Sequence, residues 1–315
     1  MPAFDGATAW LNTDQLAGAT LRGTVVLVSF WTYTCINWIR TLPYLRAWSD
    51  TYGPHGLLVV GVHTPEFDVE HDVENVRRAA RDLEVEYPIV VDNGYAVWDA
   101  FANQYWPSLY IADAEGYIRH RHFGEGGYER SENVLRQLLA DAGVLELPAR
   151  VAPVRRRAIE APADWPNVRS SETYLGFDRS QGFASPGGGV LDQLRYYSVP
   201  RELGLNRWAL QGGWILRHQE AVVNEPNGRI VFRFFARDLN LILVPPSGSP
   251  GRIEVRLDGR RPDAAAGADV DGAGTCTVDA PRLYQLIRQP GPIEDRVFEV
   301  ELLDPGMSAL CFTFG

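Results

Sequence analysis

The sequence contains no lysine, so its 30 fixed side-chain cations are all arginines. Without a side-chain amine the chain cannot form a lysine Schiff base, and it lacks the lysine of a phosphate-binding P-loop. Nucleic-acid binding needs a positive surface, whereas the formal net charge here is -10, so no nucleic-acid partner is expected. No apolar run is long enough to cross a bilayer, so membrane insertion is not expected either.

Cysteine is also scarce, and Cys35, Cys276 and Cys311 are the only three. This number does not make a disulfide framework, which small secreted domains build from even sets of cysteines. Residues 1–13 have neither a basic start nor an apolar segment, so they show no secretion signal. We therefore expect a cytoplasmic location. The alternative is that the sequence is a piece of a larger membrane-anchored protein.

The first half of the chain alternates signals for strands and helices. Short apolar runs rich in β-branched residues predict buried strands, and apolar residues at spacings of three and four predict helices. Their order is typical of an α/β fold in which a mixed sheet lies between helices. The expected strands are 25–30, 57–62, 88–91, 108–112 and 117–123, and the expected helices are 36–52, 73–83 and 129–142.

A linker and a β-rich half follow. Residues 144–170 are rich in proline and contain Arg155, Arg156 and Arg157, which predicts a semi-rigid linker with a solvated arginine run. After residue 170 the helical periodicity fades, and turn pairs such as Pro250-Gly251 separate short strand-forming runs, as in an antiparallel β-sandwich. The expected strands are 228–236, 239–244, 252–257, 275–278, 282–287, 297–303 and 310–314.

Cys35 lies between the strand 25–30 and the helix that begins at about residue 36. The unpaired N–H groups and the positive dipole end of a helix N-terminus favour a thiolate, which is the nucleophilic form of cysteine. Pro43 falls inside this helix and is expected to kink it. The pair Trp106-Pro107 directly precedes the strand at 108, so this peptide bond is a candidate for the cis form.

These residues resemble a known family. The segments WTYTCINW (31–38), GVHTPEF (61–67) and HFGEG (122–126), with Pro43 and Trp106-Pro107, resemble the thioredoxin-like redoxins of the DipZ/TlpA type. In the second half, SETYLGF (171–177), FASPGG (183–188), RLYQLI (282–287) and FTFG (312–315) resemble the C-terminal domain of the DipZ type. The resemblance implies a thioredoxin fold over 1–143, a linker over 144–170, and a jelly-roll-like β-sandwich similar to carbohydrate-binding modules over 171–315.

The sequence departs from this family at one position. The family's motif is Cys-x-x-Cys, whereas this chain has Cys35-Ile36-Asn37-Trp38. A dithiol enzyme needs its second thiolate to resolve the mixed disulfide, and Trp38 cannot do so. We therefore expect single-cysteine chemistry without a cofactor, in which Cys35 attacks a peroxide or exchanges with a small-molecule or protein thiol or disulfide. The alternatives are a redox-inactive binding protein and a sandwich that binds glycans.

Several residues are expected to support Cys35. Thr32 matches the threonine of a peroxiredoxin-like Thr-x-x-Cys pattern, although Val28 stands where that pattern has proline. The resemblance implies that Glu66 transfers protons near the thiol. Arg40 would supply positive potential unless it is exposed on its helix. The expected walls of the substrate groove are Trp31, Tyr33, Trp38, Trp106 and Pro107. For Trp31, Tyr33 and Trp106, ordinary core packing is the alternative.

Other chemistry-bearing residues have a plain structural interpretation. His120 and His122 alternate on one strand and share a face, but no third metal ligand stands at a characteristic spacing, so no metal is expected. Asp269 and Asp271 resemble part of a calcium loop and are better explained as a turn. Core packing is also the favoured alternative to a sugar-stacking platform for Tyr196, Tyr197, Trp208, Trp214 and Tyr284.

Overall fold

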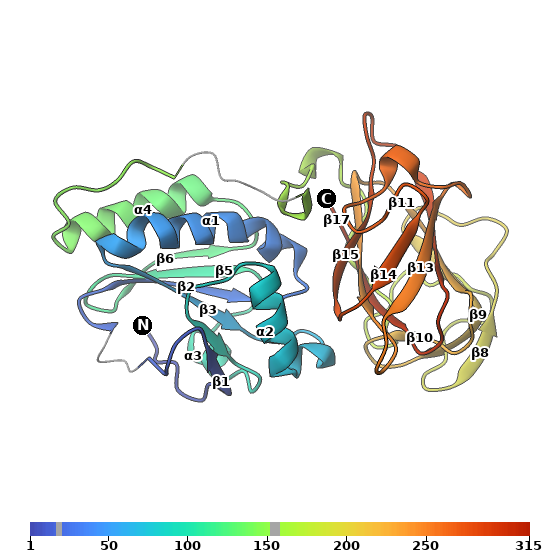
Figure 1. Cartoon of the computed structure of the whole chain (residues 1–315), viewed down its shortest axis with the longest axis horizontal. Helices are drawn as coiled ribbons and strands as arrows, with labels where there is room; N and C mark the ends of the chain where they lie inside the picture. The colour runs from blue at the N-terminus through green and yellow to red at the C-terminus, as the bar shows by residue number, and fades with distance from the viewer. Residues whose placement is uncertain (17–20, 152–157) are drawn as a thin grey trace. The chain divides into compact units, whose positions relative to one another are not determined.

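The computed structural model describes residues 1–16, 21–151 and 158–315. The chain divides into two compact units, Met1–Ala161 and Pro162–Gly315, and Figure 1 labels many of their helices and strands. Within the described residues, helices long and apolar enough to traverse a bilayer do not occur. The arginine run at 155–157 lies outside the described residues.

The first unit is built on a six-stranded sheet with the strand order β1-β4-β3-β2-β5-β6. β2, β3 and β4 run parallel, and the remaining pairs are antiparallel, so the sheet is mixed as the sequence predicted. Every residue of β2 is buried, which matches its continuous apolar run. The strands are β1 Ala9–Leu11, β2 Val25–Trp31, β3 Leu57–His63, β4 Ile89–Val91, β5 Ser108–Ala112 and β6 Ile118–Phe123.

Helices cover both faces of this sheet. On one face, Phe30 packs edge-on against Trp98 from the α3 segment. On the other, Trp31 stacks on Trp38 of α1, and α4 lies alongside α1 (Figure 1), with the rings of Tyr44 and Tyr128 stacked between them. This arrangement confirms the predicted thioredoxin fold. The helices are α1 Ile36–Tyr52, α2 Val73–Asp82, α3 Ala96–Ala100 and α4 Tyr128–Asp141.

The described part of the segment after α4 is held against the first unit. Glu160, in the short 3-10 helix Ala158–Glu160, is fully buried, and its carboxylate lies 2.6 Å from Nη2 of Arg46 on α1. The backbone N–H of Val151 donates to Glu132 of α4 at 2.7 Å. These contacts make residues 144–151 and 158–161 part of the first unit.

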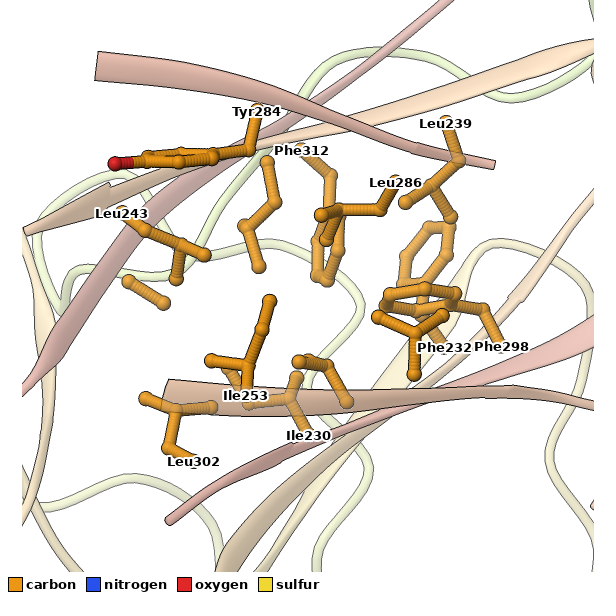
Figure 2. Packing of buried hydrophobic residues seen from close by; sticks show 14 of the residues in the cluster. Ile230, Phe232, Leu239, Leu243, Ile253, Tyr284, Leu286, Phe298, Leu302 and Phe312 are labelled. Carbon is orange, nitrogen blue, oxygen red and sulfur yellow. The ribbon is translucent and has the colours of Figure 1, made fainter. Parts of the chain in front are cut away.

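The second unit consists of antiparallel strands in two layers, which confirms the predicted sandwich. Figure 2 shows side chains such as Leu243, Tyr284 and Phe312, from β12, β15 and β17, facing Ile253 and Phe298, from β13 and β16. The strands are β7 Thr173–Tyr174, β8 Leu194–Tyr197, β9 Arg207–Leu216, β10 Ala221–Val223, β11 Gly228–Phe234, β12 Asp238–Val244, β13 Gly251–Leu257, β14 Thr275–Val278, β15 Arg282–Arg288, β16 Arg296–Leu302 and β17 Ser308–Phe314.

β9 belongs to both layers. Its first half, 207–211, pairs with β11, and its second half, 212–216, pairs with β8 and β10. Gly212 lies where the partner of β9 changes from β11 to β8. Its φ is 94°, a left-handed backbone conformation that residues with a Cβ rarely adopt. The strand therefore changes layers at a glycine, which is how corners of β-sandwiches are commonly made.

Replacing Gly61 with alanine is expected to destabilise the first unit by about 1–3 kcal/mol, the typical effect of overpacking a core. Gly61 lies in β3, and a Cβ there would stand 2.8 Å from Nε1 of Trp31 and 3.1 Å from Cε2 of Tyr87. Chemical denaturation followed by tryptophan fluorescence measures the effect. Gly94→Ala is the matched control, because a Cβ at Gly94 meets no atom within 4 Å. Equal stability of the two variants would contradict the prediction.

Candidate active site around Cys35

Cys35 occupies the N-cap of α1. Its backbone is extended, with φ -74° and ψ 108°, its N–H donates to the carbonyl of Thr32 at 3.2 Å, and its carbonyl accepts from Ile39 N at 3.0 Å. The thiol side chain is half-buried. The first turn of α1 carries no acidic residue, so the positive end of the helix dipole is not offset there. This placement suits a nucleophilic thiolate.

Trp38, three residues after Cys35, points into the core. Its side chain is fully buried, and its ring lies parallel to that of Trp31 with centroids 4.1 Å apart and an interplanar angle of 21°. Tyr33 is also buried, at 2% exposed. These three aromatic residues therefore support the Cys35 turn from inside rather than presenting open faces to a substrate.

The Thr32 hydroxyl is directed to the interior. It lies 3.5 Å from Nε2 of His63, the last residue of β3, and both residues are fully buried. Burial lowers the pKa of His63 to about 3, so this imidazole is neutral at physiological pH. The rings of Tyr33 and Trp31 enclose it at centroid distances of 5.7 and 4.9 Å.

Glu70 is a buried carboxyl that the sequence analysis did not identify. Its Oε1 accepts from the Thr34 hydroxyl at 2.6 Å, and its Oε2 accepts from the N–H groups of Glu66 and Phe67 at 2.6 and 3.0 Å. Glu66, the predicted acid, is half-buried and contributes its backbone to this arrangement. Glu70 follows Glu66 by four residues in a 3-10 helix, Asp68–His71, that no periodicity in the sequence indicated.

The Trp106-Pro107 peptide bond is cis. Trp106 is half-buried, and its indole N–H donates to the carbonyl of Thr64, the residue after β3, at 3.1 Å. The carbonyl of Pro107 accepts from Gly124 N at 2.8 Å, which ties the HFGEG segment to this turn. These two hydrogen bonds link Trp106-Pro107 to the GVHTPEF and HFGEG segments.

Arg40 is not an exposed helix residue, because it is only 2% exposed. Its guanidinium pairs with Glu125 of the HFGEG segment at 3.5 Å. On the same side, the hydroxyls of Thr41 and Tyr128 are 3.2 Å apart. These contacts join α1 to Glu125 of the HFGEG segment and to Tyr128, the first residue of α4, and the charge of Arg40 is used in an ion pair.

The remaining candidates have structural roles. His120 lies 3.2 Å from Ser131 Oγ, and no group of three or more metal-ligating side chains assembles among the described residues. Asp271 accepts from the backbone and hydroxyl of Thr275, so it closes a turn. Of the five sandwich aromatics only Tyr196 is exposed, and its hydroxyl donates to Glu225. The four core aromatics are Tyr197, Trp208, Trp214 and Tyr284.

Comparisons with known proteins find matches to both halves of the chain. Residues 1–121 match the AhpC/TSA family, and residues 170–315 match the thioredoxin-like C-terminal domain. The chain is 37% identical to protein DipZ of Mycobacterium bovis over 265 residues, which is 82% of this chain and 36% of DipZ. It is 30% identical to the thiol-disulfide oxidoreductase YkuV of Bacillus subtilis over 141 residues, covering 45% of this chain and 95% of YkuV.

Among solved structures, the chain is similar to a thioredoxin-like protein determined in its oxidised form, with 31% identity, a TM-score of 0.40, and coverage of 43% of this chain and 91% of that one. The chain spans only about a third of DipZ, at 36% of its length. YkuV, in contrast, is matched over nearly its whole length. The chain therefore belongs to the thioredoxin-like redoxins, with an AhpC/TSA-family region followed by a thioredoxin-like C-terminal domain.

Proposed function

We propose that this protein is a monothiol oxidoreductase in which Cys35 exchanges with protein thiols and disulfides through a mixed disulfide. The proposal is carried by two features of the Cys35-Ile36-Asn37-Trp38 motif. The Cys35 thiol is half-buried at the start of α1, and a core tryptophan, Trp38, stands where a resolving cysteine would be needed. The similarity to the thiol-disulfide oxidoreductase YkuV favours thiol–disulfide exchange as the reaction class.

The reaction has two balanced steps. The Cys35 thiolate attacks one sulfur of a substrate disulfide, a new sulfur–sulfur bond forms, and the second substrate sulfur leaves as a thiolate with the bonding electron pair. An external thiolate then attacks the mixed disulfide and releases Cys35 as a thiolate. The external thiol does the work of a resolving cysteine, because Cys276 and Cys311 are buried in the second unit.

The proposal assigns supporting roles to three further residues. Trp106 and Pro107 shape the substrate groove, and Glu66 exchanges protons with the leaving thiolate. Thr32, whose hydroxyl lies beside His63, fixes the turn before Cys35. Attack on a peroxide, which would give a sulfenic acid on Cys35, is the second form of this chemistry, but the inward direction of the Thr32 hydroxyl favours disulfide exchange. The burial of four of the five sandwich aromatics favours core packing over sugar stacking for those four residues.

Cys35→Ser is expected to remove the fast reaction of the protein with an aromatic disulfide reagent. The wild type should release a single equivalent of reporter thiol and retain the other half on Cys35, identified by mass. Burial raises the pKa of Cys276 to about 12, so its thiolate is roughly a thousandfold scarcer than that of an ordinary thiol. The double variant Cys276→Ser/Cys311→Ser is the matched control and should react like the wild type.

Two outcomes would contradict the proposal. A Cys35→Ser variant with the wild-type rate would place the reactive thiol elsewhere. A wild-type Cys35 that reacts no faster than a free model thiol would favour a redox-inactive binding protein. Treatment with limiting peroxide, followed by trapping of a sulfenic acid on Cys35, distinguishes attack on a peroxide from disulfide exchange.

A further inference from the structure

Resting on the proposed function, we infer that Tyr105, Arg121 and Phe123, which we call the aromatic patch, are a docking site for substrate proteins. The patch fits an extended segment that carries an aromatic or long aliphatic side chain next to a carboxylate. Tyr105 and Phe123 are 53% and 48% exposed, and their ring centroids lie 5.3 Å apart. Adjoining exposed aromatic side chains are typical of binding surfaces, because their rings supply a large contact area.

The hairpin of β5 and β6 holds the patch in place. The Phe123 ring packs edge-on against Tyr110 of β5 at a centroid distance of 6.1 Å, and the Arg121 guanidinium lies 5.8 Å from the centre of the same ring. Tyr110 is buried, and its hydroxyl donates to Asn103 at 3.0 Å. The side chains of the patch therefore rest on a fixed ring, so a partner need not order them when it binds.

The patch lies on the sheet face that α3 covers in part. The Tyr110 ring beneath it packs edge-on against Phe30, at a centroid distance of 5.6 Å, and Phe30 in turn contacts Trp98 of α3. His120 of β6 points to the opposite face, where its imidazole lies 3.2 Å from Ser131 of α4. The patch is thus distinct from the face that α1 and α4 cover.

The strand register places the patch at the same end of the sheet as Cys35. Phe123 pairs with Ser108 of β5, and Ser108 pairs with Phe30 of β2, the strand that precedes the Cys35 turn. β6 and β2 are two strand spacings apart, which is about 10 Å. An extended segment rises about 3.3 Å per residue, so a segment joined to Cys35 reaches the patch about three to six residues from its own cysteine.

Arg121 determines the charge that the partner should carry. In the described part of the chain no carboxylate pairs with Arg121, whereas Arg119, two residues earlier on β6, pairs with Asp113. The chain has a formal net charge of -10, so an unpaired surface arginine is a local exception in a protein that repels acidic partners. A carboxylate beside the partner's apolar side chain would give Arg121 its counter-charge.

The test compares two synthetic peptides whose single cysteine is capped as a disulfide with an aromatic reporter thiol. One peptide carries a Phe-Asp pair four residues after its cysteine, and the other carries Ala-Asn there. We expect the full-length wild type to release the reporter about tenfold faster from the Phe-Asp peptide. Tyr105→Ala and Phe123→Ala should each reduce this preference about fivefold, the usual effect of truncating a central aromatic contact. Arg121→Gln should remove the part of the preference that weakens with salt.

Two variants of the same hairpin are matched controls. Tyr117→Ala removes another exposed aromatic side chain, and Arg119→Gln removes a cation that is already paired. Both should keep the tenfold preference, and all five variants should react like the wild type with a small aromatic disulfide reagent, which cannot reach the patch. Equal rates of the wild type with the two peptides would overturn the inference, as would an equal loss of preference in Tyr117→Ala.

A binding measurement separates this inference from the proposed function. A fluorescent Phe-Asp peptide with serine in place of its cysteine should bind Cys35→Ser about fivefold more tightly than Cys35→Ser/Tyr105→Ala. This difference together with an unreactive Cys35 would overturn the proposed function alone, whereas a reactive Cys35 without the difference would overturn the inference alone. A dimer of the full chain that Tyr105→Ala dissociates would assign the patch to a second copy of this chain and would also overturn the inference.

Discussion

Replacing Trp38 with cysteine is expected to raise the disulfide reductase activity of the protein. Residues three apart at the start of a helix have Cβ atoms about 5–6 Å apart, and a small adjustment brings two thiols into disulfide distance. Attack by a thiol in the same chain benefits from a high effective concentration, so insulin reduction should rise by about tenfold or more over the wild type. On oxidation, mass analysis should find Cys35 bonded to the introduced thiol.

Trp38→Cys also loses stability, and its control must lose a similar amount. Trp38 is fully buried against Trp31, and deleting a buried tryptophan costs about 3–5 kcal/mol. Trp38→Ser leaves nearly the same cavity but no thiol, so it isolates the chemical effect from the loss of stability. If Trp38→Cys and Trp38→Ser reduced insulin equally slowly, the lack of a resolving thiol would not be what limits the wild type.

Asp238→Asn is expected to destabilise the second unit by about 3–5 kcal/mol at neutral pH, the usual effect of breaking a buried ion pair. Asp238 begins β12 and is fully buried, with its carboxylate 2.7 Å from Arg288 and 2.7 Å from Arg237. The amide would leave the two guanidinium groups without their shared counter-charge. Hydrogen exchange of β12 and β15 amides in the full chain measures the loss locally.

The ion pairs of Asp238 also make the stability of the second unit depend on pH. Burial alone would raise the pKa of Asp238, but the guanidinium groups of Arg288 and Arg237 hold it below its usual value. A carboxyl with a lowered pKa in the folded state stabilises the protein above its unfolded pKa, about 3.9, and this contribution is lost as the pH falls through the folded value. The difference between wild type and variant should therefore be largest near neutrality and shrink in acid.

Asp304→Asn is the control for the ion pair. Asp304 also pairs with an arginine, Arg252, at 2.9 Å, but the two side chains are 27% and 67% exposed. Exposed pairs contribute about 0–1 kcal/mol, so exchange in the second unit should hardly change. A loss as large as that of Asp238→Asn would mean that burial is not the deciding factor.

The sequence predicted the fold well wherever periodicity and burial agree. The apolar run of β2 and the three-and-four spacing of α2 each led to an element close to the observed one. β9 was not predicted, because Gly212 and Gly213 interrupt its strand-forming residues. α3 has only five residues, too few to show a helical period.

The site was predictable only where it is continuous in sequence. Cys35 could be placed at a helix start from its neighbours alone, since the strand and helix signals flank it directly. Glu70 could not, because its hydrogen bond with Thr34 depends on how the loop after β3 folds back onto the turn before α1. The inward direction of Trp38 was equally hidden, since a tryptophan in a first helical turn can face either the core or the solvent.

The contact between Arg46 and Glu160 bears on how the first unit should be expressed by itself. A fragment ending at residue 143, where the last helix stops, would lose the buried carboxylate that pairs with Arg46 and the backbone donor to Glu132. The truncated protein would expose apolar surface along α1 and invite aggregation. A fragment ending after Ala161 retains both contacts and is the natural boundary for recombinant work on this unit.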